Sequence, residues 1–393
     1  MNIKVIAPIL LTLVLTACGG GGGGGGASPA TPVSSLSTVA HITNANTVNN
    51  ITAADLNGDG LEDIVVSGWN YDVLTAYVYI FIQNADGSLT DKTHDLLSNN
   101  VIEGSQRILV ADFDSDGHID IFVPGFGDGS QIYAAHSIMF WGSSGQYIRE
   151  VWSDKNAAHG ACIGDLNNDG KMDILAAGGG FSGGDVGGIY INNGNRTFAL
   201  QLSNVLGADQ FAACAVIKDG NDSFIFLSNN SVLLGYRDRI IKMRTDLTII
   251  TDTAVADNGY DTVDVIATDL NSDGRKDFVV ITNDTTVLMP GPTKIYTNNG
   301  DGTFSLTNTL PMTRSGFYGR ALTIDGVAGF FVSGDVNNAM IYKGTTRYKS
   351  TAFVDMAQNT TQSQDAVLYQ NSSTSKLYML ELLNNTFYTK ELR

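Results

Sequence analysis

Residues 55–66 read DLNGDGLEDIVV, and this stretch decides the fold. Three more segments keep the same pattern, with Asp at positions 1, 5 and 9, Asp or Asn at position 3, Gly at position 6 and an apolar run directly afterwards. They are residues 112–123 (DFDSDGHIDIFV), 165–176 (DLNNDGKMDILA) and 269–280 (DLNSDGRKDFVV). Such self-similarity indicates a repeat architecture, which has to be interpreted before local detail.

The spacing of the four loops predicts further units that have lost the acidic pattern. The first residues of the loops are 57, 53 and 104 residues apart, and the last gap is twice 52. Residues 215–227 stand in the middle of that gap and keep the apolar runs without the Gly and the last Asp. Residues 322–334 continue the spacing, and residues 365–390 form a last, worn unit. We therefore expect seven units.

Each unit has room for four short strands. In the first unit we expect them at residues 51–55, 63–67, 77–82 and 89–94, with turn signals such as residues 84–87 between the third and the fourth. No stretch has a long helical period. The sequence therefore predicts an all-β fold, a seven-bladed propeller with four-stranded blades. The last unit has three strands, and residues 36–43 are expected to supply its fourth and close the ring.

The Asp-rich loops join the first and second strands and have the composition of calcium sites. Side-chain oxygens at positions 1, 3, 5 and 9 and a backbone carbonyl at position 7 make an all-oxygen shell, which suits Ca²⁺ better than Mg²⁺. Gly at position 6 permits the tight turn with positive φ. We expect about four ions. The predicted ligands are Asp55, Asn57, Asp59, Leu61, Asp63, Asp112, Asp114, Asp116, His118, Asp120, Asp165, Asn167, Asp169, Lys171, Asp173, Asp269, Asn271, Asp273, Arg275 and Asp277.

An EF-hand and a metal-free turn are the two alternatives to calcium loops between strands. An EF-hand opens with the same pattern but needs a Glu at position 12 and flanking helices. Position 12 is Val66, Val123, Ala176 or Val280 here, inside predicted strands, which argues against the EF-hand. The other alternative is an Asx-rich turn without metal. Four copies with the same positions filled favour calcium, which would also relieve the repulsion among neighbouring carboxylates.

Loops of this kind between strands resemble the FG-GAP, or VCBS-type, repeats of integrin α-subunit propellers. The resemblance is strong in four units and weak in three, and the Phe-Gly and Gly-Ala-Pro parts are poorly kept. It implies the propeller fold and the calcium ligands. It does not imply a particular integrin-like partner, because similar repeats occur in adhesins, lectins and exported scaffolds, and sometimes beside enzymes.

The N-terminus predicts a lipid-anchored protein. Residues 1–17 have the short positive start and the apolar run of a signal peptide, too short to span a bilayer. They end in Leu15-Thr-Ala-Cys18, which looks like a bacterial lipobox and implies lipidation of Cys18. Residues 18–34, with eight consecutive glycines, are expected to form a tether to the propeller of residues 35–393. Gly19 favours the outer membrane, because it is not the Asp that retains lipoproteins at the inner membrane.

The acidic composition of the chain limits the kinds of partner that it can bind. The formal net charge of −17 argues against nucleic acid and against direct attraction to anionic lipid, which leaves the lipid anchor as the membrane contact. We expect a monomer. Besides Cys18 the chain has Cys162 and Cys214, in equivalent parts of successive units. Either a disulfide, which an extracytoplasmic compartment allows, or two buried thiols fits this placement.

A ligand is expected on the face opposite the Asp-rich loops, which is the ligand face of integrin-like propellers. The loops after the second strand and those entering the first strand mix aromatic, amide and charged side chains, a composition that suits a glycan or a protein loop. Ordinary loop chemistry is the alternative. The candidate ligand contacts are Trp69, Tyr71, Arg107, Phe126, Tyr133, His159, Phe181 and Arg320.

Nothing in the sequence indicates catalysis. The five His residues are scattered, and there is no Gly-x-Ser-x-Gly elbow, His-Glu-x-x-His motif or phosphate-binding loop before a helix. The leading interpretation is a calcium-binding recognition or adhesion module for a protein or polysaccharide, and not an enzyme. The alternatives are a glycan lyase or hydrolase, with His159 and Arg107 or Arg320 near the axis, and a structural component of an envelope assembly.

Overall fold

The computed structural model divides the chain into two units, Met1–Val33 and Ser34–Arg393. It describes residues 37–41 and 47–391 except 71–72, 74, 106, 127–134, 157, 159, 180–185, 202–212, 229–236, 256–259, 285–288, 311–318, 325, 333–339, 345, 349–365, 372–373, 375 and 384–385. The predicted signal peptide, Cys18 and the glycine tether lie outside the described residues. Among those that are described, no helix is long and apolar enough to cross a membrane.

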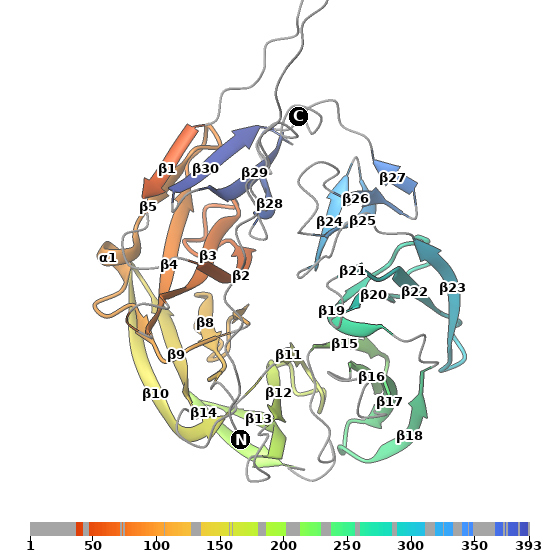
Figure 1. Cartoon of the computed structure of the whole chain (residues 1–393). Coiled ribbons are helices and arrows are strands. Elements are labelled where there is room, and N and C mark those ends of the chain that lie inside the picture. The colour runs from red at the N-terminus through yellow and green to blue at the C-terminus, as the bar shows by residue number, and fades with distance from the viewer. Residues whose placement is uncertain are drawn as a thin grey trace, which may run out of the picture. The chain divides into compact units, whose positions relative to one another are not determined.

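The described part of the second unit folds into antiparallel sheets, each built from consecutive strands except the last, which also includes β1 (Figure 1). Sheet 1 contains β2 (Thr47–Ala54), β3 (Asp63–Asn70), β4 (Thr75–Gln83), β5 (Leu89–Asp91) and β6 (Val101–Ile102). Sheet 2 contains β7 (Leu109–Ala111), β8 (Asp120–Val123), β9 (Ala135–Ser143) and β10 (Gln146–Asn156). Sheet 3 contains β11 (Ala161–Gly164), β12 (Asp173–Gly179), β13 (Val186–Gly194) and β14 (Thr197–Gln201).

The remaining sheets follow the same order along the chain. Sheet 4 contains β15 (Cys214–Asp219), β16 (Asp222–Leu227), β17 (Arg239–Arg244) and β18 (Ile249–Ala254). Sheet 5 contains β19 (Asp261–Thr268), β20 (Asp277–Asp284), β21 (Met289–Pro290), β22 (Thr293–Asn298) and β23 (Phe304–Leu310). Sheet 6 contains β24 (Gly319–Ile324), β25 (Val327–Val332), β26 (Met340–Lys343) and β27 (Thr346–Tyr348). Sheet 7 contains β28 (Ala366–Asn371), β29 (Lys376–Leu383), β30 (Thr386–Glu391) and β1 (Ser37–His41).

This arrangement is an all-β propeller with four-stranded blades, but the prediction of seven equal four-stranded blades is wrong. Five of the described sheets have four strands, and sheets 1 and 5 have five. In sheet 1 the fourth strand β5 pairs with only the Phe81–Gln83 end of β4. The two-residue strand β6 pairs with the other end, at Ala76 and Tyr77. In sheet 5 the short strand β21 likewise pairs with the end of β20 that β22 leaves open.

The local prediction for the first unit was close. The second and third strands fall where they were expected, the first starts earlier, at Thr47, and the fourth ends at Asp91 rather than at residue 94. The short helix α1 (Thr93–Leu96) follows instead. In sheet 4, which lacks the acidic pattern, β15 and β16 span residues 214–227, within one residue of the predicted unit of residues 215–227, and meet in a tight hairpin in which Asp219 pairs with Asp222.

The expected closure of the ring is confirmed. Strand β1 pairs antiparallel with β30, with Ser37 opposite Thr389 and Thr38 opposite Tyr388. The N-terminal strand therefore completes the sheet formed by the last three strands of the chain (Figure 1). Pairing within one sheet removes the unpaired edge that β30 would otherwise present.

The core lies between neighbouring sheets rather than within one. One apolar cluster joins sheet 1 to sheet 7, and others join sheets 1 and 2, 2 and 3, 3 and 4, 4 and 5, and 5 and 6. The second strands are consequently buried on both faces. Ile64, Val65 and Val66 are all fully buried, and this explains an apolar run without alternation. The first strands of sheets 1 to 6 contact one another in order, and the first strand of sheet 1 also contacts that of sheet 7.

Candidate metal loops and the axial pocket

The four Asp-rich loops share one hydrogen-bonded geometry at positions 1, 5 and 6. In the first loop, Asp55 accepts bonds from the backbone N–H groups of Asp59 (3.1 Å) and Gly60 (2.8 Å). The equivalent bonds from position 6 to position 1 measure 3.0, 3.0 and 2.9 Å in the other three loops. The position-6 glycines have φ between 83° and 90°, the left-handed region expected for the tight turn.

Position 4 of the loops carries a signal that the sequence analysis missed. Gly58, Ser115, Asn168 and Ser272 all have positive φ, between 60° and 76°. Gly, Asn and Ser are residues that turns tolerate well, and their recurrence at this position was visible in the sequence. Two left-handed residues in each loop fold the chain back so that the side chains of positions 1, 3 and 5 converge.

In the second loop all three of these side chains are carboxylates. There Asp112, Asp114 and Asp116 each offer a carboxylate oxygen, and these oxygens lie within 4.8 Å of one another. A compact set of hard oxygen donors fits a divalent cation such as Ca²⁺. Bound in the loop, such an ion would supply positive charge that cancels the repulsion among the carboxylates.

The position-9 carboxylates are built into the sheet. Asp63 accepts from the backbone N–H of Leu56 (2.9 Å) with one oxygen and from that of Gln83 (2.8 Å) with the other. The equivalent Asp120, Asp173 and Asp277 make the same pair of bonds, to position 2 of the loop and to the third strand. These side chains therefore fasten the loop to its sheet, and their direct coordination of an ion stays a prediction.

Burial raises the pKa of the position-9 carboxyl groups. It raises the pKa of Asp63 and Asp120 to about 7 and that of Asp173 to about 6, and it also raises the pKa of Asp277. The two backbone N–H donors of each carboxylate oppose this rise, whereas the neighbouring loop carboxylates add to it. A cation in the loop would act against the rise, because it favours the charged form.

Amide side chains of the third strands connect the first and third loops to the sheet before each of them. Asn192 donates to the carbonyl of Phe113 in sheet 2 (2.6 Å) as well as to Met172 in its own sheet (3.1 Å). Gln83 likewise donates to Glu62 (2.8 Å) and to Gln370 in sheet 7 (3.3 Å). Sequence reasoning missed these residues, because nothing local marks an amide that bonds to a neighbouring sheet.

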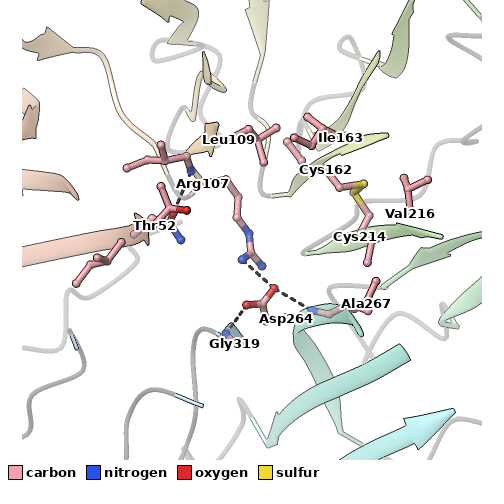
Figure 2. A pocket seen from close by; sticks show the side chains of 16 residues that line it. Thr52, Arg107, Leu109, Cys162, Ile163, Cys214, Val216, Asp264, Ala267 and Gly319 are labelled. Carbon is pink, nitrogen blue, oxygen red and sulfur yellow. Dashed lines mark hydrogen bonds and ion pairs between the residues drawn. A yellow bond between two sulfur atoms is a disulfide. The ribbon is translucent and has the colours of Figure 1, made fainter. Parts of the chain in front are cut away.

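A pocket of about 290 Å³ lies where the first strands meet, lined by residues of sheets 1 to 6 (Figure 2). Arg107 from sheet 2 reaches Asp264 of sheet 5, with 2.9 Å between Nη1 and Oδ1. Asp264 also accepts from the backbone N–H of Gly319 in sheet 6 (2.6 Å). Burial raises the pKa of Asp264, and the Arg107 guanidinium opposes that effect.

A disulfide joins Cys162 of β11 to Cys214 of β15 on the wall of this pocket (Figure 2). Of the two possibilities that the sequence left open, the bridge is the one observed. It links the first strands of sheets 3 and 4 covalently. The Arg107–Asp264 ion pair forms a second, non-covalent link, from sheet 2 to sheet 5.

The structure describes four of the eight predicted ligand contacts. Trp69 and Phe126 both lie against Gly104, whose carbonyl accepts from the N–H of Phe126 (3.3 Å). Arg107 forms the axial ion pair, and Arg320 pairs with Glu62 of sheet 1. Their role as ligand contacts, like that of Trp69 and Phe126, stays a prediction. The other four, Tyr71, Tyr133, His159 and Phe181, lie outside the described residues.

Residues 55–123 match the FG-GAP-like repeat family. The matched stretch spans the first two Asp-rich loops and confirms the resemblance there. The crystal structure of BBS1N in complex with ARL6DN is similar to this chain at a TM-score of 0.52 and 9% identity, over 92% of this chain and 97% of the other. At that identity the similarity concerns the fold alone.

Two further solved structures are more distant. Trypanosoma rangeli sialidase aligns with 79% of this chain and 58% of its own at 10% identity and a TM-score of 0.44. The V. cholerae biofilm matrix protein Bap1 aligns with 92% of this chain and 60% of its own at 14% identity and a TM-score of 0.37. None of the curated proteins compared with this chain matches it.

Proposed function

We propose that this protein is a calcium-binding recognition module, a β-propeller that binds a protein or a polysaccharide at the cell envelope. The observation that carries the proposal is the repeated loop geometry, in which the same backbone N–H groups orient the first carboxylate of each of four loops. In the second loop the oxygens of three carboxylates converge within 4.8 Å. An all-oxygen set repeated four times suits calcium as a structural ion.

The ligand is proposed to bind on the face where Trp69 and Phe126 meet at Gly104. Aromatic rings beside peptide groups suit the apolar face of a sugar or a side chain of a partner protein. Attachment to the outer membrane through Cys18 remains part of the proposal, as does the absence of an enzymatic activity.

The test is binding to a glycan array and to solubilised envelope proteins, each with calcium and with a chelator. We expect calcium-dependent binding that Trp69→Ala and Phe126→Ala reduce at least tenfold, since aromatic anchors dominate such contacts. Ile148→Ala is the matched control, because Ile148 is an apolar side chain on the outer strand β10 with 54% of its surface exposed. Equal binding by all three variants would contradict the assigned face, and binding that ignores calcium would contradict the role of the ion.

A further inference from the structure

Arg196 of sheet 3 lies on the second metal loop, which belongs to sheet 2. Its Nε donates to Oδ2 of Asp114 (2.7 Å), and its Nη2 lies 3.7 Å from Oδ2 of Asp116. Asp112, Asp114 and Asp116 are the carboxylates whose oxygens converge. A positive side chain from one sheet therefore contacts two predicted calcium ligands of the sheet before it.

The guanidinium is held in this position by other contacts. Its central carbon lies 5.2 Å from the centre of the Trp141 ring, a distance typical of cation–π attraction. The Trp141 ring is itself fixed, because its Nε1 donates to Glu150 (2.6 Å). The ion pair is also sheltered from solvent, since only 7% of the Asp114 side chain is exposed. Arg196 therefore acts on the loop as a fixed charge.

The second loop differs from the other three in the number of Asp side chains at its predicted ligand positions. It has Asp114 at position 3, where the other loops have Asn57, Asn167 and Asn271, and so its predicted ligand positions hold four Asp side chains instead of three. Arg196 offsets the additional negative charge. The ligand positions of this loop would otherwise be the most acidic of the four loops.

The basic side chains of the third and fourth loops are placed differently. Lys171 pairs with Asp169 and Arg275 pairs with Asp273, both two residues away in the same loop. Their side chains are 31% and 39% exposed, close to the 35% of Arg196, so that the difference lies in their partners: each pairs with one carboxylate of its own loop, whereas Arg196 contacts two carboxylates of the neighbouring sheet. In the described part of the chain, no basic side chain pairs with a carboxylate of the first loop, Asp55, Asp59 or Asp63.

We infer that Arg196 sets the calcium affinity of the second loop and links the occupancy of that loop to the contact between sheets 2 and 3. This inference rests on the calcium binding proposed above. A fixed positive charge beside two ligand carboxylates repels an incoming Ca²⁺ and competes for their oxygens. At a separation of about 4 Å in a water-like medium, one unit charge changes the affinity for a divalent ion roughly thirtyfold, and screening by physiological salt lowers this to roughly five- to tenfold.

The test is calorimetric titration of the full-length chain with calcium, together with terbium titration followed by luminescence excited through Trp141. Arg196→Gln should tighten one class of site roughly fivefold, and Arg196→Lys, which keeps the charge, should change it less. The double variant Asp114→Asn with Arg196→Gln removes one negative and one positive charge and should return the affinity close to that of the wild type. Lys171→Gln and Arg275→Gln are the controls: each removes a charge from another loop and should change the affinity of the terbium site that Trp141 sensitises less than twofold.

The outcomes separate this inference from the proposal on which it rests. A wild-type chain that binds no calcium overturns both. Calcium binding that Arg196→Gln leaves unchanged, or changes no more than Lys171→Gln does, overturns the inference alone. Thermal unfolding of each variant in chelator shows whether it is folded, and Arg196→Lys with the double variant keeps the comparison decisive if Arg196→Gln is unstable.

Discussion

At the scale of single residues, buried carboxylates hold this propeller together through backbone donors as much as through charge. Asp173 is buried and accepts from the backbone N–H groups of Leu166 and Asn192, both at 2.9 Å. Glu62 likewise pairs with Arg320 of sheet 6 and accepts from the N–H of Gln370 in sheet 7 (2.7 Å). Each such group satisfies donors that would otherwise be buried without a partner.

Asp173→Asn should therefore destabilise the fold even though the two side chains have the same shape. An amide has one oxygen, so its NH₂ group would face either the Leu166 or the Asn192 backbone donor. We expect a loss of about 1–3 kcal/mol in the free energy of unfolding, the cost of one unsatisfied buried group. Urea unfolding measures it, with Asp219→Asn as control, because Asp219 is exposed in the tight hairpin of sheet 4. Equal losses in the two variants would count against this role.

The ion pair across the axis makes a second prediction at this scale. Asp264→Leu leaves Arg107 buried without its carboxylate, and Arg107→Met leaves Asp264 without its guanidinium. Each single change should cost about 3–5 kcal/mol of unfolding free energy, whereas the double variant should be close to the wild type, because an apolar pair replaces a buried ion pair. A double-mutant cycle from urea unfolding checks this. Additive losses would show that the two side chains act independently.

At the scale of elements, most sheets form from strands that are neighbours in the sequence, and one sheet joins the two ends of the propeller. Each sheet except sheet 7 is formed by strands that follow one another along the chain. Sheet 7 instead unites β1 with β30, near opposite ends of the chain. Sheets 3 and 4 are in turn joined by the Cys162–Cys214 bridge. Both features constrain how far neighbouring sheets can separate.

Removal of β1 should open the ring. A chain that starts at Asn44 lacks this strand, exposes the edge of β30 and is expected to unfold at lower urea and to form aggregates. A chain that starts at Ser35 keeps β1 and is the control. Urea unfolding and light scattering compare the two, and equal stability would show that the last three strands suffice without the fourth.

Removal of the disulfide should also weaken the fold. The bridge spans 52 residues, for which the loss of loop entropy in the unfolded chain corresponds to about 4 kcal/mol. We expect the double variant Cys162→Ser, Cys214→Ser to unfold at lower urea than the oxidised wild type, and we expect reductant to lower the midpoint of the wild type alone. A midpoint of the wild type that reductant leaves in place would refute the assignment.

At the scale of the whole molecule, the excess of negative charge is concentrated where the ions are proposed to bind. The chain has a formal net charge of −17, and four divalent ions would bring it to about −9. Ions bound only by the native state stabilise it by mass action. The propeller is therefore expected to depend on calcium along much of its ring.

Chelation should lower the thermal midpoint of unfolding. At a free calcium concentration a hundred times the Kd, each site contributes about 2.7 kcal/mol. Differential scanning calorimetry in calcium, in magnesium and in chelator checks this, with magnesium expected to restore less because it prefers fewer protein ligands and a stricter geometry. The same midpoint in all three solutions would refute the proposed sites.

Sequence alone determined the features that recur or that depend on local chemistry. The nine-residue loops, their spacing and the apolar runs after them predicted the sheets, the position of the loops between first and second strands, and the worn units, because turns and strands are encoded over a few neighbouring residues. Tertiary structure decided which distant side chains meet. The axial pair of Arg107 and Asp264, the Cys162–Cys214 bridge and the contact of Arg196 with Asp114 depend on how closed sheets face one another, and no local pattern encodes that geometry.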